Sequence, residues 1–269
     1  MYLDFYQLKE MPFNITPDPR FLYFTGRHRE AFDHLLYGIE HRKGFIQLTG
    51  EVGSGKTTLC RAVLSQLPTT IRTALVLNPC LSETQLLRAI INDFGLDPSG
   101  NDRLAYIEQL NEFLLGQLNE GYNVALIIDE AQDLEPEVME QIRLLNNLET
   151  DQHKLMQIVL VGQPELEEKL SRNELRQLRQ RITVKAHLSA LSEEETGEYI
   201  AHRLQVAGAQ GRLSFDRAAV RQIHKVAQGT PRVVNTIADR AMMAGYIMNT
   251  FSIGAKEVKR AIRDLEMKP

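Results

Sequence analysis

From residue 45 to residue 188, short apolar runs alternate with segments whose apolar residues recur at helical spacing. Five runs rich in β-branched residues predict strands: Phe45–Thr49, Thr73–Leu77, Val124–Ile128, Gln157–Val161 and Ile182–Leu188. The segments between them predict helices: Lys56–Gln66, Glu83–Phe94, Arg103–Leu118 and Glu137–Leu148. Strands that are apolar on both faces and alternate with helices indicate an α/β fold, in which helices sandwich a parallel sheet.

The two ends of the chain follow other patterns. Residues 1–43 are rich in aromatic residues and prolines and turn helical from His28 to Glu40, so we expect a leader packed on the core. After Leu188 the strand pattern stops, and amphipathic helices are predicted: Glu193–Ala207, Arg217–Ala227, Val233–Met248 and Ala255–Leu265. We therefore predict an α/β domain over residues 1–188, leader included, and a small all-helical domain over residues 189–269.

The composition of the chain limits which binding partners and which cellular compartment we expect for the protein. Lys and Arg number 31 and Asp and Glu 35, so the net charge is −4 and supplies no cationic excess for phosphate backbones. Nucleic acid is therefore not the expected partner. No basic run precedes an apolar stretch at the N-terminus, which predicts a cytoplasmic location. Cys60 and Cys80 lack metal-ligand spacing and are expected in the core.

A glycine-rich segment joins the first predicted strand to the helix after it. Residues 50–57 match the pattern G-x-x-x-x-G-K-[ST] in the context that this pattern requires. Its backbone N–H groups would surround phosphates at the helix N-terminus, with Lys56 on the β and γ phosphates and the Thr57 hydroxyl on Mg²⁺. The segment predicts an ATP-binding P-loop that comprises Gly50, Glu51, Val52, Gly53, Ser54, Gly55, Lys56, Thr57 and Thr58.

Two acids end the strand predicted over Val124–Ile128. This position places Asp129 at the carboxyl edge of the sheet, where ligands of open α/β sheets bind. We expect Asp129 to hold Mg²⁺ through water and Glu130 to act as the base that polarises the attacking water. Acids also end strands as helix caps, but the P-loop upstream favours the catalytic interpretation. The two motifs together predict Mg²⁺-dependent ATP hydrolysis.

With both motifs in one α/β domain and a helical tail behind it, the chain resembles the AAA+ ATPases. Within them it looks most like the ExeA/GspA and MshM family of bacterial type II secretion and MSHA-pilus ATPases. The resembling segments are Phe5–Leu8, Met11–Asn14, Thr16–Tyr23, His28–Ala31, Gly50–Thr57, Asp129–Gln132 and Leu160–Leu166. The resemblance implies a homo-oligomeric switch or assembly factor for secretion or pilus biogenesis. It implies secretion or pilus assembly proteins of the inner membrane as partners, and at most a peripheral place at that membrane.

The resemblance also assigns roles to single residues. Asn78 matches the polar partner that restrains Glu130, although a plain turn residue before Pro79 explains it equally well. Gln163 occupies the sensor-one position, which orients water or touches the γ-phosphate. Arg232 matches the sensor-two arginine of the helical lid.

The resemblance also implies an arginine that reaches into the next subunit, just before the last strand of the sheet. Arg181 is favoured and Arg179 comes second, while a solvated helix face is the alternative for either one. For adenine, the candidate region is Thr16–Tyr23 together with the lid near Pro231, although packing of the leader on the core is the more common use of such a segment.

Two other functions compete with the secretion role. The first is a DNA-transposition or partition helper ATPase, which would require a local basic patch. The second is a nucleotide-gated regulator with little turnover, against which Glu130 argues. Longer relatives carry a membrane segment and a peptidoglycan-binding domain after the ATPase, so we expect either a compact protein or a fragment of a longer one.

Overall fold

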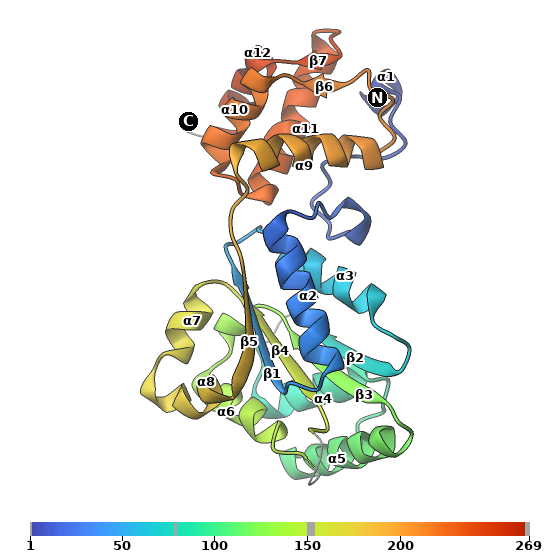
Figure 1. Ribbon diagram of the computed structural model, residues 1–269, viewed down its shortest axis with the longest axis vertical. Coiled ribbons are helices and arrows are strands. Elements are labelled where there is room, and N and C mark those ends of the chain that lie inside the picture. Colours follow the sequence, from blue (N-terminus) through green and yellow to red (C-terminus); the bar gives the residue numbers. More distant parts are fainter. Residues whose placement is uncertain (1, 78–79, 150–153, 267–269) are drawn as a thin grey trace. The chain divides into compact units, whose positions relative to one another are not determined.

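The computed structural model describes residues 2–77, 80–149 and 154–266. By its internal contacts the chain divides into two compact units, which are seen in Figure 1. We call Met1–His28, Glu51–Thr58 and Ser189–Pro269 the helical unit, and Arg29–Gly50 and Leu59–Leu188 the sheet unit. Each unit is described by itself.

The sheet unit contains one five-stranded sheet in which all pairings are parallel. Its strands are β1 (Phe45–Gly50), β2 (Ile71–Val76), β3 (Asn123–Ile128), β4 (Gln157–Gly162) and β5 (Ile182–Leu188). They lie in the order β2-β3-β4-β1-β5. The predicted parallel sheet is confirmed. Because all five strands run the same way, the carboxyl ends of β1, β3 and β4 lie at one edge of the sheet.

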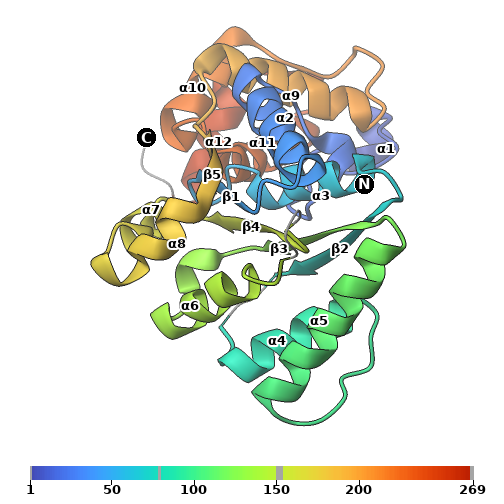
Figure 2. The ribbon, with the colours of Figure 1, turned by 60° about the horizontal axis from the view of Figure 1, so that its bottom comes forward.

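Helices cover both faces of this sheet, as Figure 2 shows. α2 (Gly26–Glu40) and α3 (Lys56–Gln66) lie over one face, and α4 (Glu83–Asp93), α5 (Arg103–Asn119) and α6 (Pro136–Leu145) lie over the other. α2 approaches β1 closely, because a Cβ on Gly38 would stand 2.6 Å from the Ile46 side chain. The opposite face buries a cluster that includes Leu126 and Leu160 from the strands and Leu86 and Leu110 from the helices.

Four short elements follow β3 and β4 and were not predicted. They are the 3₁₀ helices η2 (Ala131–Asp133) and η3 (Asn173–Leu175) and the six-residue helices α7 (Glu165–Leu170) and α8 (Arg176–Arg181). Elements of this length complete fewer than two turns, so they leave no readable periodicity in the sequence. α7 begins two residues after Gln163 and therefore lies beside the candidate site.

The helical unit is built from four long helices, α9 (Glu193–Val206), α10 (Arg217–Ala227), α11 (Pro231–Ile247) and α12 (Ala255–Asp264). α9 begins in a capping box, in which the Ser192 hydroxyl accepts from the Glu195 N–H at 3.1 Å and the Glu195 carboxylate accepts from the Ser192 N–H at 2.8 Å. The expectation that strands stop after Leu188 is wrong, because β6 (Ser214–Phe215) and β7 (Ser252–Ile253) pair in parallel. Two residues are too few to show alternation.

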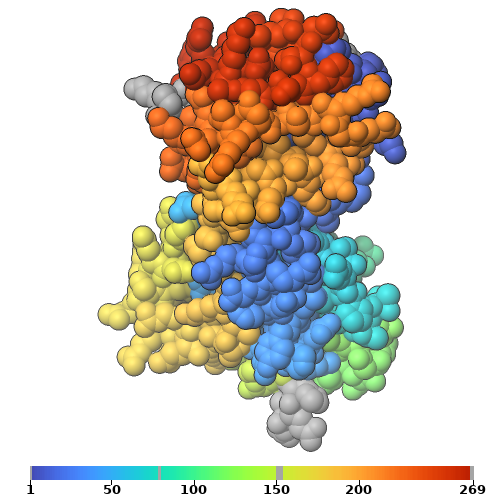
Figure 3. All heavy atoms as spheres, turned by 45° about the horizontal axis from the view of Figure 1, so that its top comes forward, coloured from blue at the N-terminus to red at the C-terminus, as the bar shows by residue number. Residues whose placement is uncertain are grey.

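The leader packs against the C-terminal helices of its own unit. Figure 3 shows it in blue beside the orange and red helices. From α1 (Tyr2–Tyr6), the Tyr6 hydroxyl donates to the Met242 carbonyl at 2.8 Å. The Arg203 guanidinium donates to the carbonyls of Pro12 at 2.5 Å and Asn14 at 3.0 Å. The contacts thus group the leader with the helices, whereas the expected domain boundaries grouped it with the sheet. Those boundaries stay a prediction.

Two further features bear on the expectations from composition. Cys60 is buried as expected, but Cys80 is exposed, so the expectation for Cys80 is wrong. The reason is its place in the loop between β2 and α4, outside both elements. Within residues 2–77, 80–149 and 154–266, we find no helix with both the length and the apolar character needed to cross a membrane.

Candidate functional site

The P-loop adopts a backbone that only its glycines tolerate easily. Gly53 has φ +76° and Gly55 φ +100°, both in the left-handed range. Lys56 is buried, with its ammonium donating to the Glu51 carbonyl at 3.1 Å. The buried Ser54 hydroxyl has no hydrogen-bond partner among the described residues. A glycine-lined cradle, a buried ammonium and an unpaired hydroxyl at a helix N-terminus fit a bound phosphate.

Arg232 lies against this loop. Its backbone N–H donates to the Gly53 carbonyl at 3.2 Å, and a Cβ on Gly53 would stand 2.6 Å from the Arg232 Cβ. α11 starts at Pro231, a residue that suits the first helical position because it has no N–H to leave unpaired. The structure therefore brings the expected lid arginine to the P-loop, and its role toward nucleotide stays a prediction.

A pocket opens beside the P-loop within the helical unit. Its walls come from the leader, the P-loop and the C-terminal helices, and they are mostly aromatic and apolar. The lining residues are Phe21, Leu22, Tyr23, His28, Ser54, Gly55, Thr58, Leu191, Tyr199, Arg203 and Pro231. This includes part of the region that the sequence suggested for adenine. A purine face suits such walls. The contributions of Leu191 and Tyr199 were not foreseen, since no motif marks them.

His28 is one of the residues that line this pocket and is 4% exposed. Its Nδ1 is 2.8 Å from the Thr25 hydroxyl, and the ring also forms a hydrogen bond with the Ser54 backbone. Burial lowers the pKa of His28 below its ordinary value, because the protonated ring loses its hydration. At neutral pH the ring is therefore neutral.

Acidification should destabilise the protein through His28. The unfolded chain takes up a proton as the pH falls below about 6.5, whereas the folded ring resists it, so the penalty grows with further acidification until the lowered pKa is reached. We expect a lower melting temperature at pH 5.5 than at pH 7.5, and a smaller difference in His28→Gln. The exposed His34→Gln is the matched control. If the melting temperature of His28→Gln depends on pH as that of the parent does, this assignment is wrong. Burial also lowers the pKa of His202, so His202 should account for part of the pH dependence that remains in His28→Gln.

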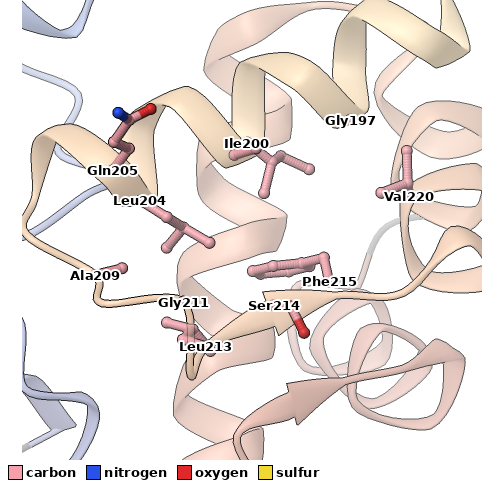
Figure 4. A pocket seen from close by; sticks show the side chains of 11 residues that line it. Gly197, Ile200, Leu204, Gln205, Ala209, Gly211, Leu213, Ser214, Phe215 and Val220 are labelled. Atoms are coloured by element: carbon pink, nitrogen blue, oxygen red, sulfur yellow. The ribbon is translucent and has the colours of Figure 1, made fainter.

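A second hollow in the helical unit lies between α9, β6 and α10 and is shown in Figure 4. Ile200, Leu204, Leu213, Phe215 and Val220 give it apolar walls. None of the predicted site residues lines it. It is therefore separate from the nucleotide pocket.

The two predicted acids lie at the carboxyl edge of the sheet, within the sheet unit. Asp129 is 4% exposed, and its Oδ1 accepts from the Glu130 N–H at 2.9 Å. Glu130 is half-buried and has φ +52°, a left-handed conformation that costs a non-glycine residue on the order of 1–3 kcal/mol. Strain of this kind concentrates at functional positions, where the surrounding structure holds it in place.

Gln163, the expected sensor-one residue, contacts Glu130, and its role toward water or the γ-phosphate stays a prediction. The Gln163 Nε2 donates to the Glu130 Oε2 at 3.3 Å. The parallel register explains the proximity, because Ile128 pairs with Leu160 and the residues after both strands share one edge. Asn78, the expected partner of Glu130, lies outside the described residues.

The two candidate arginines differ in their surroundings. Arg181 is half-buried, and its Nη1 donates to the Asn147 Oδ1 and to the Arg143 carbonyl, the latter at 3.4 Å. Arg179 is exposed, with its Nη1 3.4 Å from the Ser171 carbonyl. The Arg181 side chain is therefore held more firmly by its neighbours, whereas the Arg179 side chain is more exposed to solvent.

Comparison with known proteins defines the class. Residues 39–170 match the family described as an AAA domain. The structure of the Aeropyrum pernix ORC2 protein with ADPNP and ADP shares the fold, with a TM-score of 0.75, 18% identity and coverage of 96% of this chain and 72% of that chain. The Thermotoga maritima RuvB branch migration motor has a TM-score of 0.58 and 22% identity, covering 88% and 69%. The protein is an AAA-type, nucleotide-binding P-loop ATPase.

A relative in sequence identifies the family more closely. The chain is 46% identical over 255 residues to General secretion pathway protein A of Aeromonas hydrophila, covering 94% of this chain and 46% of that protein. The chain belongs to the family of General secretion pathway protein A, which confirms the resemblance seen in the sequence. It spans less than half the length of this relative.

Proposed function

We propose that this protein hydrolyses Mg²⁺-bound ATP and uses the cycle to switch or assemble part of a bacterial secretion apparatus. One observation carries the hydrolytic part: Glu130 lies just after β3 in a strained conformation, and its carboxylate accepts a hydrogen bond from the side chain of the sensor-position Gln163. The secretion part rests on the identity to General secretion pathway protein A. Pilus biogenesis is a second setting that the sequence resemblance supports.

Each group of the site has a distinct task in this proposal. The P-loop amides, Lys56 and the Ser54 hydroxyl bind the phosphates, and the purine occupies the pocket of Phe21, Tyr199 and Pro231. The Thr57 hydroxyl and the Asp129 carboxylate offer the oxygen donors that Mg²⁺ prefers. Bound Mg²⁺ supplies charge neutralisation on the β and γ phosphates.

Hydrolysis itself needs a base beside the γ-phosphate. Glu130 takes a proton from a water molecule as the water oxygen bonds to the γ-phosphorus and the bond to the β–γ bridging oxygen breaks, which releases ADP and phosphate. Gln163 fixes the Glu130 carboxylate during this step. An arginine from the next subunit of a homo-oligomer, Arg181 or Arg179, would stabilise the charge that develops.

The predicted location follows from the same family. We propose a cytoplasmic ATPase that works at most peripherally at the inner membrane, with secretion or pilus assembly proteins as partners. A DNA-helper role is not favoured, because the net charge of −4 gives no general attraction to phosphate backbones.

Loss of Lys56 tests the nucleotide site directly. We expect Lys56→Ala to weaken ATP binding by about 10- to 100-fold, the range that a charged hydrogen bond contributes, because the phosphates lose a buried ammonium. Titration calorimetry with Mg-ATP measures the change, with the exposed Lys225→Ala as the matched control. Binding in Lys56→Ala that equals the parent would refute the proposed P-loop site.

A further inference from the structure

The side chain of Gln132 joins the candidate base to Gln163, the residue that follows β4. Its Nε2 donates to the Glu130 Oε2 at 2.9 Å, and its Oε1 accepts from the Gln163 backbone N–H at 3.0 Å. The Gln163 side chain donates to the same Glu130 oxygen at 3.3 Å. The three residues therefore form a closed ring of hydrogen bonds at the carboxyl edge of the sheet.

The end of β4 leaves room for this ring because it has no side chain there. A Cβ on Gly162 would stand 2.8 Å from the Gln132 Oε1 and 2.9 Å from the Leu166 Cδ2. Real Cβ atoms do not approach heavy atoms so closely. Since Gly162 has no positive φ, turn geometry does not account for the glycine, whereas the close approach of the Gln132 and Leu166 side chains does.

Lys169 of α7 holds the segment on which Gln132 lies. Its ammonium donates to the carbonyls of Gln132 and Leu134, both at 2.6 Å. These carbonyls belong to η2 and its C-cap, directly after the strained Glu130. A lysine that donates hydrogen bonds to two carbonyls of this turn stabilises the turn and with it the left-handed backbone of Glu130.

We infer that Gln132 is a positioning residue that sets the orientation of the Glu130 carboxylate for water activation. Two amide N–H groups occupy Oε2, so Oε1 is the oxygen left to face the attacking water. A carboxylate is planar, and fixing one oxygen from two directions fixes the other. Gln132 also ties this orientation to the backbone at Gln163, so that a shift at the sensor position moves the base. The inference rests on the proposed role of Glu130.

The test replaces the amide and keeps the volume. Gln132→Met retains length and packing but neither donates to Glu130 nor accepts from the Gln163 N–H. We expect kcat to fall by about 100-fold, the loss that a displacement of about 1 Å can cause, while KM and the Kd for Mg-ATP stay unchanged. Gly162→Ala should lower kcat in the same direction with Gln132 intact. The exposed Gln210→Met is the matched control and should behave as the parent.

The outcomes separate this inference from the proposed function. Full turnover in Glu130→Gln would overturn the proposed base itself. A dead Glu130→Gln beside a Gln132→Met with parental kcat would overturn only the positioning role. The positioning role is also overturned if Gln132→Met loses ATP affinity and thermal stability along with kcat. A side chain that only stabilises the turn would lower all three quantities together. A fall in kcat alone supports the inference.

Discussion

Glu130→Gln is expected to bind ATP as tightly as the parent and to lose turnover by about 10²- to 10⁴-fold, the contribution of general base catalysis. The amide keeps the shape of the side chain but cannot accept a proton from the water that attacks the γ-phosphorus. Binding should survive because the proposed phosphate contacts come from Lys56 and the P-loop, which this substitution leaves unchanged. Release of inorganic phosphate measures turnover, and retention of labelled ATP measures binding.

Two further measurements and a control variant sharpen this experiment. ATP should remain trapped in Glu130→Gln, and oligomers should accumulate, because the cycle stops before hydrolysis. The exposed Glu137→Gln on α6 is the matched control and should keep parental turnover. If Glu130→Gln turns over ATP at the parental rate, the base lies elsewhere and the strain at residue 130 serves another purpose.

The P-loop segment and the parallel sheet could both be predicted from the sequence alone. Residues 50–57 carry a pattern whose spacing is fixed by phosphate geometry, and β1 and α3 flank it as the pattern requires. The buried strands were readable because both faces are apolar, as in β3, where residues 123–128 are all buried. The place of Asp129 at the sheet edge followed from the direction of a parallel strand.

The pocket beside the P-loop depended on contacts that no local pattern contains. Phe21, Tyr199 and Pro231 come from three parts of the chain, and their meeting depends on the leader packing against the C-terminal helices. An aromatic residue in a leader and a proline that starts a helix each have ordinary structural explanations. Only the fold shows that they line one hollow.

The surroundings of Glu130 were foreseen in part. The sensor-one expectation placed Gln163 near the site, whereas Gln132 entered the sequence argument only as part of a family motif. Its contact with the Gln163 N–H spans 31 positions along the chain and depends on a missing Cβ at Gly162. The left-handed backbone of Glu130 is equally invisible in the sequence, because tertiary contacts and not residue preference hold it.

A trans-acting arginine predicts that specific activity rises with protein concentration. A monomer would lack the charge that stabilises the transferring phosphoryl group, an effect of about 10³- to 10⁵-fold in enzymes that use such a residue. Arg181 ends α8 and is held by the Asn147 amide oxygen, which would present its guanidinium in a fixed direction. We expect Arg181→Ala to lose turnover while it still binds ATP.

Mixing two inactive variants tests whether the arginine acts between subunits. Arg181→Ala retains Glu130, and Glu130→Gln retains Arg181, so a mixed oligomer contains interfaces at which an intact base meets an intact arginine. Activity should partly return in the mixture, and the exposed Arg176→Ala on the same helix should stay fully active as the control. Arg179→Ala is carried through the same mixture, since its guanidinium is the more exposed of the two. If Arg181→Ala and Arg179→Ala alone each keep full activity at every protein concentration, neither acts in trans and each active site is complete within one chain.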